Sequence, residues 1–378
     1  MADQDIVALD SHFKRYGELV KLPGRRIDRN ALSGADILLV RSVTRVDQAL
    51  LEGTPVQFVA SATSGTDHID IPWLAAQGIG FASAAGANAN AVVEYCLTAL
   101  AYLTHTGFNP AHCSVGIIGA GSVGGLFARR LLALGCRVLI CDPLLSPPQR
   151  EALAAQGAQF GDFRQTLQNQ LVSFHVPLVS EGAYATWHML DEKGLKSLPS
   201  GAVLMNTSRG EVIDNQVLYK VMSQREDLQV VLDVWEGEPE PMTALIGRAA
   251  IATPHIAGYS LEAKLRATTM IAGALDRHFQ FSPHVYTNSN SETRVSIELQ
   301  QQVCSTALCP EILTSVFAIE ALSEKFKALS HSELAAGFDR LRKQQVNRRE
   351  FSAYRLPPVR LNQVQRDFLA DLGFAFAN

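Results

Sequence analysis

The segment from Ser114 to Asp142 constrains the fold more than any other, because it joins two short apolar runs through a glycine-rich loop and a helical repeat. Residues 115–118 are apolar or glycine, as expected for a strand buried on both faces of a sheet. The next six residues have the spacing G-x-G-x-x-G. A helical pattern follows and ends at Gly135, and residues 137–142 form the second run. The segment predicts a strand–helix–strand unit that crosses over right-handed into a parallel sheet.

The glycine loop has the chemistry of a dinucleotide site. The first glycine permits a tight turn, the second lets the backbone approach a pyrophosphate, and the third allows the helix to pack closely on the strand. The amino end of the helix then offers N–H groups and a partial positive charge to the phosphates. Asp142, at the end of the second strand, can accept hydrogen bonds from ribose hydroxyls and repel a 2′-phosphate, which favours NAD over NADP. A glycine turn with a capping aspartate is the alternative, which the strand, loop, helix and acid in register disfavour. We therefore predict NAD as cofactor, bound by Gly119, Gly121, Ser122, Val123, Gly124 and Asp142.

The same alternation of strands and helices continues on both sides of this unit. Further strands are expected at 171–176, 202–205, 228–234 and 250–253, with a helix at 217–222, which together predict a doubly wound sheet. A second alternation precedes it, with expected strands at 37–40, 56–60 and 79–82, and expected helices lie at 88–104 and 261–279. Beyond about residue 285 the pattern becomes polar and helical. The chain thus predicts one domain inserted in another, followed by a separate C-terminal domain.

The bulk composition excludes several classes of partner. A formal net charge of −4 provides no basic field for nucleic acid or an anionic membrane. The longest apolar stretch, Ala91 to Thr104, contains Glu94 and is shorter than the ~20 residues of a membrane-spanning helix. The start lacks the basic and apolar regions of a secretory leader. The six cysteines include no C-x-x-C pair and no histidine at zinc-ligand spacing. We expect a cytoplasmic protein with reduced thiols and no metal.

Polar residues follow three expected strands of the larger sheet, at 206–210, 233–239 and 253–258. These positions are the carboxyl ends of parallel strands, where ligands bind in open α/β sheets. Oxidation of a 2-hydroxy acid needs a cation for the carboxylate, a base for the hydroxyl proton and a group that orients the base. Arg209 can hold a carboxylate in a bidentate fork, and His255 can take the proton. Glu238 can orient the imidazole and favour its charged form. Each residue alone is commonly a surface or turn residue, and only their ordered combination is specific.

The motifs N-T-S-R-G, D-V-W-E-G-E-P and P-H-I-A-G-Y, in this order, resemble the D-isomer-specific 2-hydroxyacid dehydrogenase family, and the resemblance covers about residues 2–283. It implies that Arg209, Glu238 and His255 are catalytic. It also implies that Asp233 holds the nicotinamide carboxamide. Further cofactor contacts implied in the same way are Val176, Thr207, Ser208 and Gly258.

A narrower resemblance, to the erythronate-4-phosphate dehydrogenase family of pyridoxal 5′-phosphate biosynthesis, is carried by V-R-S-V-T-R-V at 40–46, T-S-G-T-D-H-I-D at 63–70, A-N-A-V-V-E-Y at 89–95 and H-I-A-G-Y-S-L-E at 255–262, and by F-D-R-L-R-K with R-R-E-F at 338–351. It implies oxidation of 4-phospho-D-erythronate, a small phosphorylated hydroxy acid, to 3-hydroxy-2-oxo-4-phosphooxybutanoate. Ser42, Thr63 and Tyr259 would contact the substrate. It further implies a homodimer formed through the C-terminal domain.

The resulting fold class is α/β, with a doubly wound Rossmann NAD domain inserted in a flavodoxin-like substrate domain, plus a small C-terminal α+β dimerisation domain. We place the substrate domain at 1–95 and 257–284, the NAD domain at 96–256 and the dimerisation domain at 285–378.

One departure and two alternatives remain at this point. The family usually opens with an apolar strand, whereas residues 2–5 here read Ala-Asp-Gln-Asp, so we expect that strand to be missing, replaced by Ile6 to Leu9, or lost through a truncated start. Another D-2-hydroxyacid dehydrogenase, such as a 3-phosphoglycerate or D-lactate dehydrogenase, shares most of these motifs. A non-catalytic NAD-sensing binding protein of the same fold would share them as well.

Overall fold

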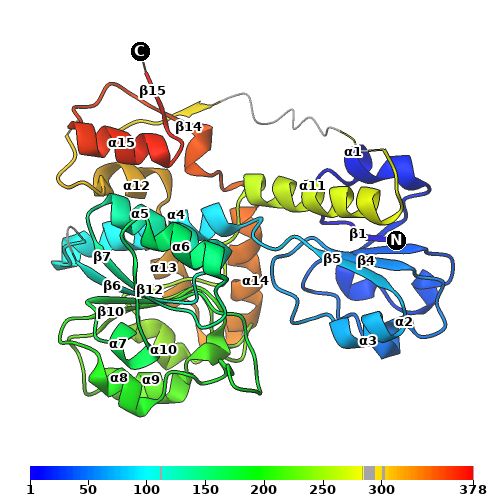
Figure 1. Cartoon of the computed structure of the whole chain (residues 1–378), viewed down its shortest axis with the longest axis horizontal. Helices are drawn as coiled ribbons and strands as arrows, with labels where there is room; N and C mark the ends of the chain where they lie inside the picture. Colours follow the sequence, from blue (N-terminus) through cyan, green and yellow to red (C-terminus); the bar gives the residue numbers. More distant parts are fainter. Residues whose placement is uncertain (111–112, 283, 285–293, 300–302, 378) are drawn as a thin grey trace. The chain divides into compact units, whose positions relative to one another are not determined.

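The computed structural model describes residues 1–110, 113–282, 284, 294–299 and 303–377 (Figure 1). The chain divides into two units. The first comprises Met1–Asn88 and Ser260–Glu292, and the second comprises Ala89–Tyr259 and Thr293–Asn378. The first unit is therefore discontinuous in sequence, as expected for a domain that receives an insertion.

The first unit is built on a parallel sheet of five strands. Their spatial order is β2 (Lys21–Leu22), β1 (Ala2–Asp3), β3 (Ile37–Val40), β4 (Phe58–Ser61) and β5 (Gly80–Ser83). This is the flavodoxin-like order 2-1-3-4-5. Alternate residues of β3 face opposite sides, so Leu39 joins one apolar cluster while Leu38 and Val40 join another. The helices are α1 (Leu9–Phe13), α2 (Gln48–Leu51), α3 (Ile71–Ala76) and α11 (Leu261–His278).

The expectation for the amino end was wrong. Ala2–Asp3 itself forms strand β1, which pairs in parallel with both β2 and β3, whereas Ile6 to Leu9 lead into α1. The strand was not predicted because it contains Asp3, and a charged residue is rarely fully buried without a partner. Its side chain is fully buried, and Arg41 Nε donates to its Oδ2 at 2.9 Å. A long-range ion pair, invisible to local pattern, therefore permits an acid in this strand.

The second unit carries a parallel sheet of seven strands. Their spatial order is β12 (Ile251–Ala252), β11 (Gln229–Leu232), β10 (Val203–Asn206), β9 (Leu171–Phe174), β6 (Ser114–Ile118), β7 (Arg137–Cys141) and β8 (Gln159–Phe160). Six of these strands were expected from the apolar runs, and the two-residue strand β8 was not. The order, reversing beside β6, is that of a doubly wound Rossmann sheet.

Helices cover both faces of this sheet (Figure 1). On one side lie α4 (Ala89–Leu103), α5 (Ser122–Ala133) and α6 (Pro147–Ala154), and on the other lie α7 (Phe163–Thr166), α8 (Glu192–Ser197), α9 (Asn215–Met222) and α10 (Thr243–Arg248). Since both faces are covered, the strands read as nearly continuous apolar runs.

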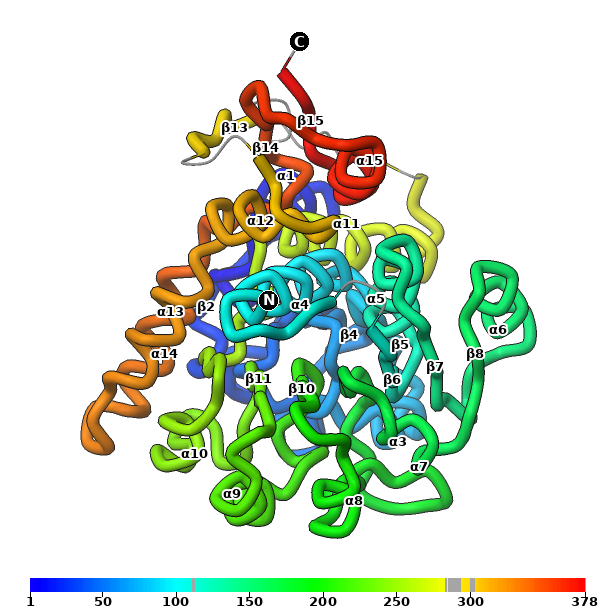
Figure 2. The backbone as a smooth tube through the Cα atoms, turned by 90° about the vertical axis from the view of Figure 1, so that its left-hand side faces the viewer, coloured from blue at the N-terminus to red at the C-terminus, as the bar shows by residue number. Residues whose placement is uncertain are grey.

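The C-terminal segment combines helices with a three-stranded parallel sheet, and the strands were not foreseen individually. Its elements are β13 (Val295–Ser296), α12 (Pro310–Val316), α13 (Ile319–Lys327), α14 (Leu334–Gln344), β14 (Tyr354–Leu356), α15 (Gln363–Asp371) and β15 (Ala375–Phe376). Helices α13 and α14 lie side by side (Figure 2), and Ala252 N of the edge strand β12 donates to Ser323 Oγ at 3.0 Å. The segment thereby covers an edge that would otherwise offer unpaired backbone groups. The separate dimerisation domain and its boundary at 285 stay predictions.

Candidate active site

The cofactor and catalytic residues expected in the second unit all follow carboxyl ends of its strands. Gly119 follows β6, Asp142 follows β7, and Val176 follows β9. Thr207 and Arg209 follow β10, Asp233 and Glu238 follow β11, and His255 follows β12. The strand order reverses between β6 and β9, which is where open α/β sheets bind their ligands.

The glycine loop has the local geometry that a pyrophosphate requires. Gly119 has a φ of +84°, in the region that favours glycine. A Cβ on Gly124 would overlap the carbonyl oxygen of Gly119, so the helix and the turn approach as closely as the backbone allows. Around Gly121, by contrast, no atom of the described residues beyond its two chain neighbours lies within 4 Å of the Cβ position. No described side chain caps α5 at this residue, so the amino end of the helix presents backbone donors to an anion.

Asp142 is fixed beside this loop. Its Oδ2 accepts from Ala120 N at 2.8 Å and its Oδ1 accepts from Leu144 N at 3.0 Å. A carboxylate has about four lone-pair positions, so two backbone bonds leave capacity for ribose hydroxyls. Val176 also lies at the loop, because its Cγ1 is 2.8 Å from the Cβ position of Gly119. These residues fit the adenosine half of NAD.

The structure brings Glu238 and His255 into contact. His255 Nδ1 lies 2.8 Å from Glu238 Oε2, and Glu238 Oε1 accepts from Trp235 N at 3.0 Å. Burial would raise the pKa of Glu238, but the charge of His255, its hydrogen bond and the Trp235 N–H together hold that pKa below its usual value. The side chains of His255 and Glu238 are 34% and 23% exposed, so both reach solvent.

His255 has a backbone conformation that non-glycine residues seldom adopt. Its φ is +54°, in the left-handed region. Such a conformation costs about 1–3 kcal/mol for a non-glycine residue and persists only where the surroundings impose it.

Hydrogen bonds to Asp233 help to impose this conformation on the loop. Its side chain is 1% exposed, and it accepts from Ile256 N and Ala257 N, both at 2.8 Å. Thr253 Oγ1 also donates to it, at 2.6 Å. Burial raises the pKa of Asp233, and these bonds and the charge of His255 oppose that rise. Asp233 therefore organises the loop behind His255, a role that the sequence did not suggest.

Asn206 shapes the loop that presents Arg209. Its Oδ1 accepts from Ser208 N at 3.0 Å and from Ser208 Oγ at 2.8 Å, while its Nδ2 donates to Arg209 O at 2.8 Å. Arg209 Nη1 donates to Ser208 O at 2.7 Å. A Cβ on Gly210 would overlap the backbone of Trp235, so this loop packs directly on the one that leads to Glu238. Arg209 and the Glu238–His255 pair thus come from adjoining loops.

Three further residues predicted to contact the cofactor lie in the same region, and their roles stay predictions. Ser208 is buried and directs its hydroxyl to Asn206. Thr207 Oγ1 lies 3.5 Å from His175 Nδ1, and burial lowers the pKa of His175 to about 3, so this histidine is neutral. Gly258 lies three residues after His255 in the same loop.

Two guanidinium groups of the C-terminal segment reach the His255 loop. Arg342 Nη2 donates to Tyr259 Oη at 2.9 Å, and its guanidinium carbon lies 5.3 Å from the centre of the Tyr259 ring. Arg348 Nη1 donates to Ile256 O at 3.1 Å and to Ala257 O at 3.0 Å. Both arginines lie in motifs that carried the narrower resemblance, but the sequence assigned neither a role.

The two substrate residues expected in the first unit follow its adjacent strands β3 and β4. Ser42 is exposed in the turn after β3. Thr63 Oγ1 lies 2.7 Å from Ser61 Oγ and donates to Gly65 O at 3.2 Å. Arg41, next to Ser42, is paired with Asp3 and, at 2.7 Å, with Asp5. The strands are parallel neighbours, so both predicted hydroxyls belong to one edge of that sheet.

Comparison with known proteins identifies the family of this chain. The family model described as "D-isomer specific 2-hydroxyacid dehydrogenase, NAD binding domain" matches residues 99–257. The erythronate-4-phosphate dehydrogenase of Pseudomonas savastanoi pv. phaseolicola is 49% identical over 277 residues, which are 73% of this chain and 71% of that protein. That of Cellvibrio japonicus is 38% identical over 387 residues, 99% of this chain and 98% of that protein. The chain belongs to the erythronate-4-phosphate dehydrogenase family. The predictions of this family and of an NAD-dependent dehydrogenase are confirmed.

Solved structures agree on the fold. A glyoxylate reductase from Paecilomyes thermophila superposes with a TM-score of 0.62 at 22% identity, covering 77% of this chain and 98% of that one. A D-lactate dehydrogenase from Aquifex aeolicus, complexed with NAD and lactic acid, gives a TM-score of 0.59 at 20% identity, covering 73% and 96%. The predicted α/β class with a Rossmann domain is confirmed.

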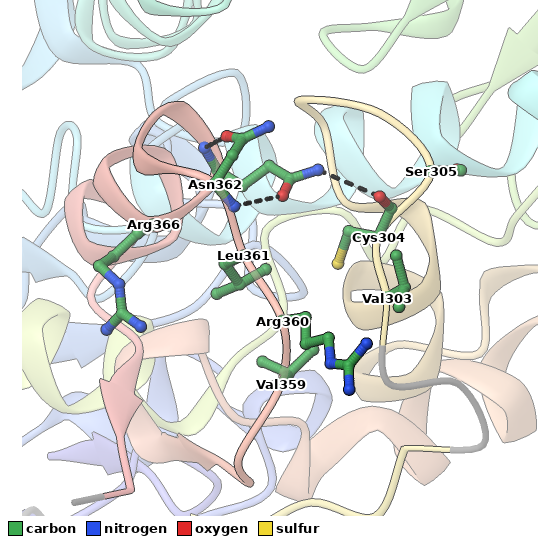
Figure 3. A pocket seen from close by; sticks show the side chains of 9 residues that line it. Val303, Cys304, Ser305, Val359, Arg360, Leu361, Asn362 and Arg366 are labelled. Atoms are coloured by element: carbon green, nitrogen blue, oxygen red, sulfur yellow. Dashed lines mark hydrogen bonds between the residues drawn. The ribbon is translucent and has the colours of Figure 1, made fainter.

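A hollow of about 640 Å³ lies elsewhere in the second unit, in its C-terminal segment (Figure 3). Asn362 and Gln365 on its wall cap helix α15 reciprocally, at 2.9 and 3.0 Å. Gln365 Nε2 also donates to Cys304 O at 3.2 Å. The lining residues are Val303, Cys304, Ser305, Val359, Arg360, Leu361, Asn362, Gln365 and Arg366, none of which was expected in the site.

The described ranges contain no group of three or more His, Cys, Asp or Glu side chains placed to hold a metal ion. No helix in the same ranges combines the length and the apolar character needed to cross a membrane.

Proposed function

We propose that this chain catalyses the NAD-dependent oxidation of 4-phospho-D-erythronate at C2, giving 3-hydroxy-2-oxo-4-phosphooxybutanoate, a step of pyridoxal 5′-phosphate biosynthesis. The observation that carries the proposal is the similarity to erythronate-4-phosphate dehydrogenases over nearly the whole chain. The contact between Glu238 and His255 supports it, because a base held by a carboxylate suits alcohol oxidation.

Residues of this chain fit both ends of the cofactor. The open Cβ position at Gly121 and the amino end of α5 suit the pyrophosphate, and Asp142 suits the adenosine ribose of NAD. When bound, NAD supplies the acceptor for the hydride that leaves C2. Asp233, Thr207 and Ser208 are the candidates for the nicotinamide end.

His255, oriented by Glu238, accepts the proton of the C2 hydroxyl. Since a carboxylate accepts and does not donate, Glu238 selects the tautomer of His255 that carries its proton on Nδ1. Nε2 is then the acceptor that takes the proton of the C2 hydroxyl as the carbonyl forms. Arg209 holds the substrate carboxylate through its guanidinium fork.

The rest of the substrate is held by hydroxyl and amide donors. Ser42 and Thr63, with neighbouring loop N–H groups, bind the phosphate, and Tyr259 contacts the carbon chain. Such backbone and hydroxyl donors can hold a phosphate without a cationic patch. We further propose that residues 285–378 form a dimerisation domain of a cytoplasmic homodimer, with the substrate domain at 1–95 and 257–284 and the NAD domain at 96–256.

A substrate panel tests the proposal. We expect kcat/KM to be highest for 4-phosphoerythronate, ahead of unphosphorylated erythronate and of 3-phosphoglycerate. A hydrogen bond to a charged group contributes about 1.5–3 kcal/mol. Removing the phosphate should therefore lower kcat/KM by roughly ten- to a hundredfold. Equal values for erythronate would refute the phosphate site, and a lead for 3-phosphoglycerate would refute the substrate while keeping the reaction class. NADH binding without turnover of any of the three would indicate an NAD-sensing protein.

A further inference from the structure

The loop that carries His255 is held by Arg348, a residue to which neither the resemblance nor the proposed reaction assigns a role. The peptide groups of Ile256 and Ala257, directly after His255, donate both of their N–H groups to Asp233. Their carbonyl oxygens accept two hydrogen bonds from Arg348 Nη1, at 3.1 and 3.0 Å. The buried Asp233 therefore holds the peptides 255–256 and 256–257, and the guanidinium holds the peptides 256–257 and 257–258. The peptide between Ile256 and Ala257 is fixed by both.

Arg348 is itself held in place. Its Nη2 donates to Ala91 O of α4 at 2.7 Å, and its guanidinium carbon lies 4.4 Å from the centre of the Phe317 ring. Burial lowers the pKa of Arg348, while the negative charges of Glu94, Asp233 and Glu350 oppose that effect. The planar fork suits this arrangement, because lysine has no second donor nitrogen to bridge the loop and α4.

Residues next to Arg348 in the sequence also anchor the segment that carries it. Phe351 N donates to Glu94 Oε1 at 2.9 Å, and Glu94 is 4% exposed on α4. Phe351 is 1% exposed and its ring stacks on that of Phe374, with centroids 5.0 Å apart. The R-R-E-F motif at 348–351 is thus anchored in the second unit at the position where Arg348 meets the loop.

We propose that Arg348 is a positioning residue that keeps His255 in its left-handed conformation, and so aims the imidazole that Glu238 orients. The proposal deepens the proposed function and rests on it. A residue in the left-handed region returns to ordinary backbone angles unless its neighbours prevent this. The Asp233 bonds constrain the two peptides that follow His255, and Arg348 constrains the second of these and the one after it through their carbonyl groups. Without Arg348, the peptides can rotate about the bonds to Asp233, and the imidazole moves with them.

The test compares Arg348→Met and Arg348→Lys with a matched control, Arg340→Met, which makes the same change at an exposed position of α14. Backbone hydrogen–deuterium exchange is measured over residues 253–259 of the full chain with NAD present. We expect faster exchange at Ile256 and Ala257 in Arg348→Met, an intermediate rate in Arg348→Lys, and the wild-type rate in Arg340→Met. This measurement needs no turnover, so it does not depend on the identity of the substrate.

Kinetics with 4-phosphoerythronate then test the consequence for catalysis. We expect kcat of Arg348→Met to fall by about ten- to a hundredfold, because a misplacement of about 1 Å has an effect of that size. KM for NAD should stay unchanged, since the glycine loop is not touched. The solvent deuterium isotope effect on kcat/KM should rise, because proton transfer becomes slower. A variant that merely contains less folded protein would keep the wild-type isotope effect.

Wild-type exchange in Arg348→Met, or a kcat within twofold of wild type, would overturn the proposal. A loss of activity in proportion to the folded fraction with an unchanged isotope effect would overturn it too. If Arg348→Met does not fold, Arg348→Lys is judged by the same two criteria. A wild-type chain that does not oxidise 4-phosphoerythronate would count against the proposed function alone, and the exchange experiment would still decide whether Arg348 holds the loop.

Discussion

Replacing Glu238 by glutamine should abolish most turnover while leaving the fold intact, because the carboxylate accepts two hydrogen bonds that an amide cannot both accept. Oε2 faces His255 Nδ1 at 2.8 Å, and Oε1 accepts from Trp235 N at 3.0 Å. A glutamine side chain has one acceptor oxygen and one NH₂ group that only donates. One of the two partners must therefore lose its acceptor.

Either arrangement of the amide is unfavourable for catalysis. If the oxygen faces Trp235 N, the NH₂ group faces His255 Nδ1, which favours the tautomer with its proton on Nε2, so this nitrogen cannot accept the substrate proton. If the oxygen faces His255, the Trp235 N–H loses its acceptor, at a cost of about 1–3 kcal/mol. The imidazolium formed during the reaction also loses its counter-charge. General acid–base catalysis contributes about 10²–10⁴-fold, so we expect kcat to fall by that factor.

The assay is the initial rate of NADH formation, with NAD affinity measured separately by fluorescence titration. The chain contains a matched control, because Glu236, two residues away, also contacts one histidine nitrogen and one backbone N–H. Its Oε1 lies 2.6 Å from His188 Nε2 and its Oε2 accepts from Asn215 N at 2.7 Å. Glu236→Gln should keep most activity. The reasoning fails if Glu238→Gln retains a kcat within threefold of wild type, or if both variants lose activity equally.

Three further predictions concern the cofactor and pH. Asp142→Ala should narrow the preference for NAD over NADP by removing the charge that repels a 2′-phosphate, and a wild-type preference for NADP in the same steady-state assay would contradict this. Gly121→Ala should leave the melting temperature unchanged yet weaken NAD binding, because its Cβ meets open space in the protein but lies where the pyrophosphate approaches; Gly124→Ala should lower both, because its Cβ overlaps the carbonyl of Gly119. The folded state depresses the pKa of Glu238, so its ionised form contributes stability above the ordinary carboxyl value of about 4.3, and that contribution is lost as the pH falls below it. Urea denaturation across this range should therefore show the stability difference between wild type and Glu238→Gln shrinking on acidification, and a constant difference would count against the shift.

Local sequence pattern was enough to predict most of the larger sheet and its glycine-rich loop. The turn at Gly119, the helix after it and the strand that ends before Asp142 depend on residues within one stretch of chain, so glycine spacing and periodicity suffice to predict them. The same holds for polar residues at strand ends, since parallel topology alone places them at one edge. Two-residue strands such as β2 and β8 were not predicted, because so short a segment has no measurable period of apolar residues.

Residue type alone could not distinguish the Glu238–His255 pair from a second Glu–His pair with similar contacts. Glu236 with His188 and Glu238 with His255 are both Glu–His pairs within 3 Å, in which the histidine has a positive φ. What favoured His255 in the sequence was its place in an ordered set of motifs. The structure adds the reason it is held so firmly, in the bonds of Asp233 to the two peptides that follow it.

The sequence by itself determined the parallel α/β architecture, the dinucleotide loop and the residues with the chemistry of a 2-hydroxyacid dehydrogenase, because each depends on short-range order in the chain. Only the tertiary structure decided that an acidic residue, Asp3, lies in a buried strand and that Arg348 holds the loop after His255. Both depend on a charged side chain meeting a polar partner from a distant position, 38 residues apart for Asp3 and Arg41 and 92 for Arg348 and the carbonyl of Ile256. A buried charge is tolerated only beside its partner, and no local pattern records where the fold will place that partner.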